Sequence, residues 1–277
     1  MAQTGATTAQ AAAPRPRETP GRKARGSGGV LLPRLLSGAV ILLLWEVIVR
    51  AFAPSFVAKP STVALAIPRV IVDPVFLESI AETLVAVAQG LAIALVFGTL
   101  IGMLMGRSTV VEKAIRHYVN GFYAIPMIVA LPLFSLWFGY APPTRVAIVV
   151  FAAIFAIIIN AADGARSVPR EYLEVARSFR STRWRAFPEI ILPASLPYLL
   201  AGFRLAAGRA LIGAVVAEFF ISIGGIGHYI LYNSRAYRHD DAFVGVLLLA
   251  AFGVGFEVLI GWVTRRYMPW YRREENN

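Results

Sequence analysis

The chain has 277 residues, of which 57% are hydrophobic and 16% are charged, and it contains no cysteine. Soluble domains carry about 25% charged residues, so this composition excludes a soluble protein and indicates an integral membrane protein. The lack of cysteine excludes disulfides and thiolate metal sites. The net charge of +11 is better explained by membrane topology than by nucleic-acid binding, because the basic residues lie beside apolar runs.

The N-terminal part is a polar tail followed by an apolar run. Residues 1–29 are rich in Ala, Thr, Pro and Gly and carry a basic cluster, so we expect a disordered cytoplasmic tail. The run from Val30 to Ala53 is too long for the core of a signal peptide, which favours a retained spanning helix. Glu46 and Arg50 are four residues apart in this run and are expected to pair.

A proline-punctuated connection leads to the second span. Residues 59–82 are polar, which suggests an external connection with a short interfacial helix. The second span, about 83–106, carries a row of glycines at four-residue spacing, namely Gly98, Gly102 and Gly106. Such a row lets another helix approach closely, and we expect it to serve packing within one subunit.

The third span is unusual because prolines interrupt it. A short basic turn is expected at 107–117, and the third span, about 119–140, contains Pro126 and Pro132. Prolines at membrane depth are tolerated where neighbouring helices or a cavity satisfy the freed carbonyl groups. This span is therefore a candidate wall of a transport pathway. A fourth span follows at about 145–162.

The longest polar segment between two apolar spans is Asp163–Pro193, with six arginines. Apolar residues recur in it at helical spacing, while charged residues fill most of the remaining arc, which predicts an amphipathic helix. The apolar residues are Tyr172, Leu173, Val175, Ala176 and Phe179. An ordinary solvated loop is the alternative.

The spacing in this segment resembles the EAA signature of membrane subunits of bacterial ABC importers, which reads EAA, three residues, Gly, nine residues and I-x-L-P. The matching residues are Glu174, Val175, Ala176, Arg180, Ile190, Leu192 and Pro193. Val175 replaces an alanine and Arg180 replaces the glycine. The resemblance implies that these residues form a coupling element that docks on a separate ATPase subunit. Glycine at position 180 would permit a left-handed turn. Because this chain has arginine there, the sequence alone does not decide whether the turn forms.

Longer strings resemble the nitrate, sulfonate and taurine branch of these permeases. They include LLLWEVIVR, LWFG, SVPREYLEVARS and GFRLAAGRALIGAVVAEFF followed by GGIGHYI. The resemblance implies an all-α, type I ABC importer permease fold with six transmembrane helices in residues 30–266, and a cytoplasmic tail at 267–277. It further implies a homodimer or a pair with a close paralogue, ABC ATPase subunits, an external substrate-binding protein and a small solute such as a sulfonate, taurine or nitrate.

The fifth span, about 193–221, holds three charged residues, Arg204, Arg209 and Glu218. Such charges are costly in lipid, so they should face protein or water. The two arginines point in different directions and need different partners. They either bond backbone carbonyls and carboxylates such as Glu46 and Glu257, or one of them attracts an oxyanion. Glu218 is expected to brace the turn at Gly224–Gly227.

The end of the chain completes the topology. A sixth span is expected at about 242–263, after a loop at 222–241 that forms a re-entrant turn or short helix. Basic residues concentrate in the two tails, at 107–117 and in Asp163–Pro193, which places both termini in the cytoplasm of a bacterium and the chain in its inner membrane.

Other functional classes fit less well. A secondary transporter or a channel would not need the basic amphipathic segment. A protein of either kind, working without an ATPase partner, is the alternative function. The histidines are scattered at His117, His228 and His239, without HExxH or GxSxG motifs, so no enzyme activity, metal or cofactor is expected. The run from His239 to Asp241 is interpreted as a solvated external turn. There is no GxxxxGK[ST] sequence, so ATP hydrolysis is expected on a partner subunit.

Overall fold

The computed structural model describes residues 28–54, 56–221 and 224–267, and in these residues it contains helices and no strand. The expected tail at 1–29 lies outside the described residues except for its last two positions, and the expected tail at 267–277 lies outside them except for its first. The chain divides into two units, Met1–Trp45 and Glu46–Asn277. The helix α1, Gly28–Phe52, begins in the first unit and ends in the second.

The predicted all-α fold with six spans is confirmed. Five helical segments are long and apolar enough to cross a membrane, and the count reaches six when a pair of helices bent by 101° is taken as one span. The five segments are α1, α3 (Pro74–Arg107), α6 (Pro142–Arg166), α9 (Leu192–Ile221) preceded by the π-helix Phe187–Ile191, and α11 (His239–Tyr267). The bent pair is α4 (Thr109–Ala124) and α5 (Met127–Phe138).

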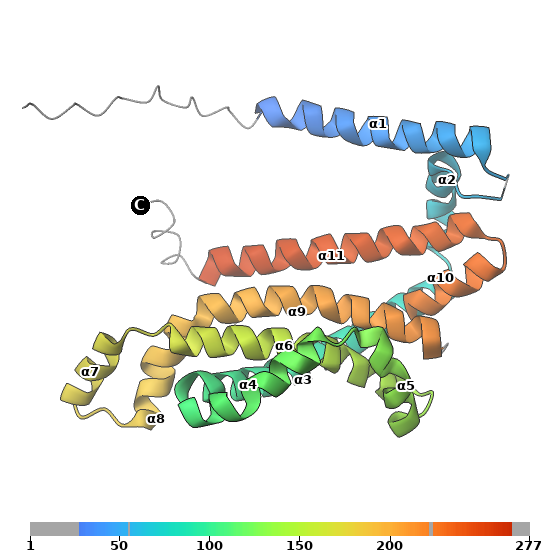
Figure 1. The fold of residues 1–277 in the computed structure, drawn as a ribbon. Helices are drawn as coiled ribbons and strands as arrows, with labels where there is room; N and C mark the ends of the chain where they lie inside the picture. Colours follow the sequence, from blue (N-terminus) through green and yellow to red (C-terminus); the bar gives the residue numbers. More distant parts are fainter. Residues whose placement is uncertain (1–27, 55, 222–223, 268–277) are drawn as a thin grey trace, which may run out of the picture. The chain divides into compact units, whose positions relative to one another are not determined.

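Short helices cap the two ends of the second unit. In Figure 1, α7 (Arg170–Ser178) and α8 (Arg183–Ala186) lie at one end of the long helices α6, α9 and α11. At the opposite end are α2 (Pro60–Val70) and α10 (Gly225–Arg235). We call these the α7 end and the α10 end. The chain therefore places the EAA-like segment and the Gly224–Gly227 turn at opposite ends of these long helices.

Two helix boundaries differ from the sequence prediction. The helix α3 begins well before the expected start because Pro74 fits its first turn and the Asp73 side chain accepts a hydrogen bond from Val75 N at 3.0 Å. The basic turn expected at 107–117 is wrong. The hydroxyl of Ser108 accepts a hydrogen bond from Val111 N at 3.4 Å, so α4 starts directly after α3.

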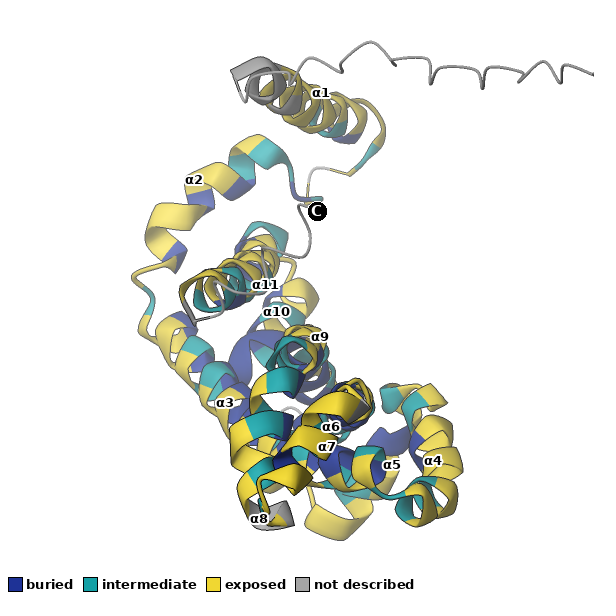
Figure 2. Ribbon diagram, turned by 90° about the vertical axis from the view of Figure 1, so that its left-hand side faces the viewer, coloured by how far each residue is buried: buried dark blue, intermediate teal, exposed yellow. Residues whose placement is uncertain are grey.

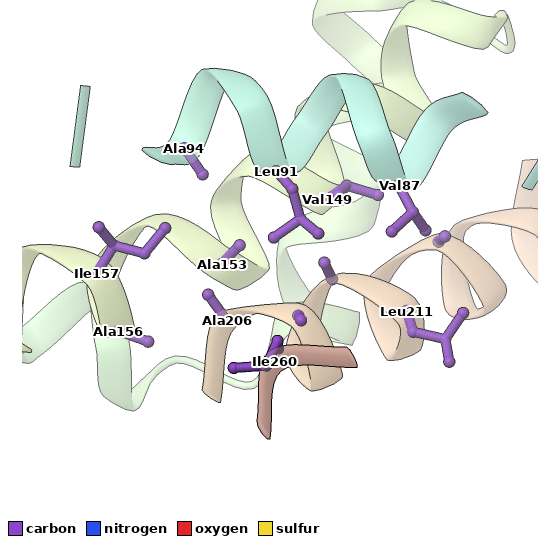
Figure 3. Close-up of a cluster of buried hydrophobic side chains, with 13 residues drawn as sticks. Val87, Leu91, Ala94, Val149, Ala153, Ala156, Ile157, Ala206, Leu211 and Ile260 are labelled. Carbon is purple, nitrogen blue, oxygen red and sulfur yellow. The ribbon is translucent and has the colours of Figure 1, made fainter. Parts of the chain in front are cut away.

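The core lies between α3, α6 and α9, and much of it consists of small residues. Figure 3 shows Ala94 of α3, Ala153 and Ala156 of α6 and Ala206 of α9 in one buried cluster. Ile260 of α11 also reaches this cluster. Small side chains let the helix backbones approach closely, which is how helices associate in a membrane where no water drives the packing.

The glycine row of α3 packs on α6, as predicted. A Cβ atom added to Gly102 would lie 2.5 Å from the carbonyl oxygen of Ile158, and one added to Gly98 would lie 3.0 Å from the side chain of Ile157. A Cβ at Gly106 would collide with the carbonyl oxygen of Ala162. Figure 2 shows the complementary pattern, with buried residues where α3, α6, α9 and α10 face one another and exposed residues on the outer faces.

Candidate functional site

The EAA-like segment forms the amphipathic helix that the sequence predicts. The helix α7 begins after Pro169 and places Leu173 and Ala176 inward, where Leu173 packs on a cluster that includes Ile191. Its other apolar residues face outward, with exposed fractions of 58% for Tyr172, 54% for Val175 and 82% for Phe179. Burial of α7 within this chain therefore uses only part of its apolar surface.

The outward apolar residues of α7 border a groove. Four positions of the EAA-like signature meet there, namely Val175, Ala176, Ile190 and Pro193, together with Tyr172, Phe179, Ser181, Glu189 and Ala194. The signature residue Leu192 lies behind the groove in the cluster around Ile191. Glu174 and Arg180 are exposed beside it. The fold thus brings the signature residues together at the α7 end.

Arg180 keeps the left-handed turn that glycine would make in the signature. Its φ is +56°, in the left-handed region. Two hydrogen bonds close the end of α7: Ser181 N donates to Ala176 O at 2.9 Å, and Arg180 N donates to Arg177 O at 2.8 Å. This is the Schellman pattern of a helix C-terminus. A residue with a Cβ costs about 1–2 kcal/mol in this conformation, so the turn is kept at the expense of strain.

Glu218 is the centre of a buried polar network at the α10 end. Its side chain is 1% exposed. One carboxylate oxygen accepts hydrogen bonds from Thr83 Oγ1 at 2.8 Å and from Arg145 at 3.2 Å, and the other accepts from Gly227 N at 2.8 Å. Thr83 Oγ1 in turn accepts from Ile226 N at 2.9 Å. The network joins α3, α6 and α9 to the first turn of α10, where Glu218 holds Gly227 N.

Two glycines allow the backbone of this turn to lie directly on carboxylates. Gly224 and Gly225 have φ of +81° and +87°. A Cβ at Gly225 would overlap the Glu218 carboxylate, and a Cβ at Gly224 would overlap that of Glu82. Arg145 lies between the two acids, 3.6 Å from Glu82. The glycines of the GGIG string therefore let the backbone lie close to two acidic side chains.

The two arginines of α9 have different surroundings. The guanidinium of Arg209 lies over the ring of Tyr123, 4.1 Å from its centroid, and Arg209 lines a pocket at the break between α4 and α5. Arg204 is exposed on the surface of the chain. Within the described residues, neither arginine forms an ion pair with Glu46 or Glu257. Glu46 instead pairs with Arg50, as predicted.

Residues 94–272 match the family described as binding-protein-dependent transport system inner membrane component. The chain belongs to this family. This permease is therefore a multi-pass protein of a bacterial inner-membrane transport family. It is similar to SsuC of Bacillus subtilis (strain 168), whose name assigns it to aliphatic sulfonate transport, at 29% identity over 92% of this chain and 91% of SsuC.

Two further relatives carry the names of other small solutes. The nitrate import permease protein NrtB of Leptolyngbya laminosa is 27% identical over 86% of the permease and 88% of NrtB. The taurine transport system permease protein TauC of Escherichia coli (strain K12) is 26% identical over 84% and 87%, respectively. The predicted resemblance to the nitrate, sulfonate and taurine branch is confirmed.

Solved structures confirm the fold. A chain of the MetNI methionine ABC transporter has a TM-score of 0.62 at 17% identity, with 69% of the permease and 95% of that chain covered. A chain of a bacterial ABC transporter for alginate import also has a TM-score of 0.62, at 15% identity, with 87% and 95% covered. The permease therefore has the type I ABC importer fold.

A second polar cluster of the permease at the α10 end could not be placed from the sequence. Asp241 is fully buried at the start of α11 and pairs with Arg238 at 2.6 Å and with Arg69 of α2 at 2.5 Å. Beside it, Thr62 donates a hydrogen bond to Asp240 at 2.7 Å. The interpretation of His239–Asp241 as a solvated turn is therefore wrong. Among the described residues, no group of three or more potential metal ligands occurs, at the histidines or elsewhere.

Proposed function

We propose that this permease is the membrane-spanning subunit of an ATP-driven importer, and that α7 and its groove dock on a separate ATPase subunit. One observation carries the proposal: a charged helix at the end of the bundle exposes Tyr172, Val175 and Phe179 on one side. Exposed apolar surface next to charged residues is typical of a protein interaction site. These residues coincide with the EAA-like signature.

The signature residues have separate roles in this proposal. Glu174 and Ala176 lie at the centre of the docking surface, and Val175 contributes an exposed apolar contact. Arg180 adds a charge next to the groove and holds the turn. Ile190 and Pro193 form the wall of the groove next to α9, and Leu192 packs behind that wall. Movement of α7 would therefore reach the span that carries Arg209 and Glu218.

The remaining partners follow from the same assignment. The α7 end and both tails, 1–29 and 267–277, face the cytoplasm, where the ATPase is. The α10 end faces an external substrate-binding protein. A second copy of the chain, or a close paralogue, supplies the other half of the pathway and a second docking surface. The permease uses no cofactor and does not hydrolyse ATP itself, since its sequence has no phosphate-binding GxxxxGK[ST] loop.

The transported solute in this proposal is a small anion such as a sulfonate, taurine or nitrate. Its support is the names of the relatives SsuC, NrtB and TauC. The alternative is a secondary transporter or channel that works without an ATPase. The two functions differ in whether uptake depends on ATP and on a second protein.

Co-purification tests the docking surface. The tagged permease is expressed together with a candidate ABC ATPase subunit from the same organism, and the amount of ATPase retained is measured. Burying a phenylalanine contributes about 1.5–3 kcal/mol, so Phe179→Ser should weaken association roughly 10- to 100-fold. Tyr140→Ser is the matched control, because Tyr140 is 72% exposed outside α7 and its groove. Full ATPase retention by a Val175→Ser, Phe179→Ser double variant, or uptake without ATP, would overturn the proposal.

A further inference from the structure

A pocket lies where α4 gives way to α5. Its volume is about 370 Å³, within the range of small-ligand sites. Its walls come from three parts of the chain: Phe122 and Tyr123 before the break, Phe151 and Phe155 of α6, and Arg209 and Ile212 of α9. The pocket therefore combines four aromatic rings with one cation.

The break itself indicates a cavity at membrane depth. The helix axis turns by 101° between Ala124 and Met127. Pro126 has no N–H group, and irregular backbone is tolerated inside a membrane only where it is buried in protein or lines a water-filled space. Arg209 lies near the middle of the spanning helix α9, so the pocket lies far from both membrane surfaces.

The charge of Arg209 is not neutralised by a carboxylate in the part of the chain that the structure describes. In those residues its guanidinium lies over the Tyr123 ring. The ring attracts the cation but provides no conventional acceptor for the five N–H donors of the guanidinium. By comparison, Arg145 at the α10 end contacts two carboxylates. A cation within a span costs free energy unless an anion or water accompanies it. Arg209 thus offers an unused anion-binding group to the pocket.

We propose that this pocket is an oxyanion site on the transport route, at which Arg209 donates two parallel hydrogen bonds to a small singly charged oxyanion. The planar guanidinium fork matches two oxygens of a sulfonate or a nitrate. The aromatic walls surround the apolar part of an organic anion. This inference rests on the proposed function, because it places the site on the import pathway, and it deepens that function by assigning the class of substrate to particular residues.

Binding of a matched pair of probes tests the site directly. Methanesulfonate and dimethyl sulfone are similar in size, both carry methyl protons, and only the first is charged. Saturation-transfer NMR on the full-length permease in lipid nanodiscs reports both from their methyl signals. We expect methanesulfonate to bind at least 10-fold more tightly than dimethyl sulfone, and sodium nitrate to displace it. Removing the charge by Arg209→Gln should weaken methanesulfonate binding about 10- to 100-fold.

Arg204→Gln is the matched control, because it removes the same charge from the same helix at a residue that does not line the pocket. It should leave the methanesulfonate dissociation constant within about 2-fold of wild type. If Arg209→Gln does not fold, Ile212→Trp fills the pocket while keeping Arg209, and it should weaken binding at least 10-fold.

Three results would overturn the oxyanion site. They are equal binding of the two probes, no binding of either methanesulfonate or nitrate to wild type, and unchanged methanesulfonate binding in the folded Arg209→Gln or Ile212→Trp variant. The measurement uses the permease without an ATPase. A failure here leaves the co-purification result intact, and a failure of co-purification leaves the probe binding intact, so the two proposals fail separately.

Discussion

The two ends of the permease differ in whether their polar and apolar groups find partners within the chain. At the α10 end, the buried acids Glu218 and Asp241 are each held by an arginine of another helix. At the α7 end, apolar residues such as Phe179 remain exposed, and a left-handed Arg180 closes the helix. The first end is completed by contacts within the chain, whereas the second presents surface that another protein can bury. The same bundle thus has one end whose polar groups are paired within the chain and one end with exposed apolar surface.

The largest expected effect comes from breaking the network at the α10 end. Glu218→Leu leaves Arg145, which is 12% exposed, without its closest carboxylate and leaves Gly227 N without an acceptor. Removing one partner of a buried pair costs about 3–5 kcal/mol of unfolding free energy. Thermal unfolding of the purified permease should show a marked drop in midpoint. Glu257→Leu, at an exposed glutamate of α11, should shift the midpoint little, and equal shifts for the two variants would contradict the assignment.

A smaller effect is expected at the other buried acid of this end. Asp241→Asn weakens ion pairs whose arginines are 62% and 53% exposed, so water can solvate Arg69 and Arg238 once the charge is gone. We expect a loss of about 1.5 kcal/mol, the lower part of the range for hydrogen bonds to charged groups. The midpoint of thermal unfolding, compared directly with that of Glu218→Leu, measures the difference. A loss as large as that of Glu218→Leu would show that solvent exposure of the paired arginines does not determine the loss of unfolding free energy.

The smallest effect, of opposite sign, is expected at the α7 end. Arg180→Gly removes the strain of the left-handed turn but makes the unfolded chain more flexible, so the net gain is about 0.5–1 kcal/mol. Hydrogen exchange of the Ser181 amide, which bonds to Ala176 O, should slow a few-fold. Arg177→Gly is the control, because glycine within the helix α7 lowers helix stability by about 1 kcal/mol and should speed the same exchange.

The spans and the amphipathic helix could be predicted because both are local patterns, of apolar length in one case and of helical spacing in the other. The outcome at position 180 could not, because an arginine adopts a left-handed turn only when neighbouring contacts demand it. Pro126 and Pro132 look alike in the sequence, yet α5 contains Pro132 and breaks from α4 at Pro126. Asp241 was misjudged because its partner Arg69 is 172 residues away, a pairing that only the folded chain reveals.

The glycine row of α3 also has a chemical consequence. Each glycine has a hydrogen where another residue would have its Cβ atom. In this row that Cα–H bond points toward a carbonyl oxygen of α6. The pairs are Gly98 with Ile154, Gly102 with Ile158 and Gly106 with Ala162, always 56 residues apart. Weak Cα–H···O contacts recur at helix–helix interfaces that are packed in this way, and each contributes about 0.5–1 kcal/mol. A side chain at any of these positions would crowd α6, so the glycines keep two parallel helices close together and in register.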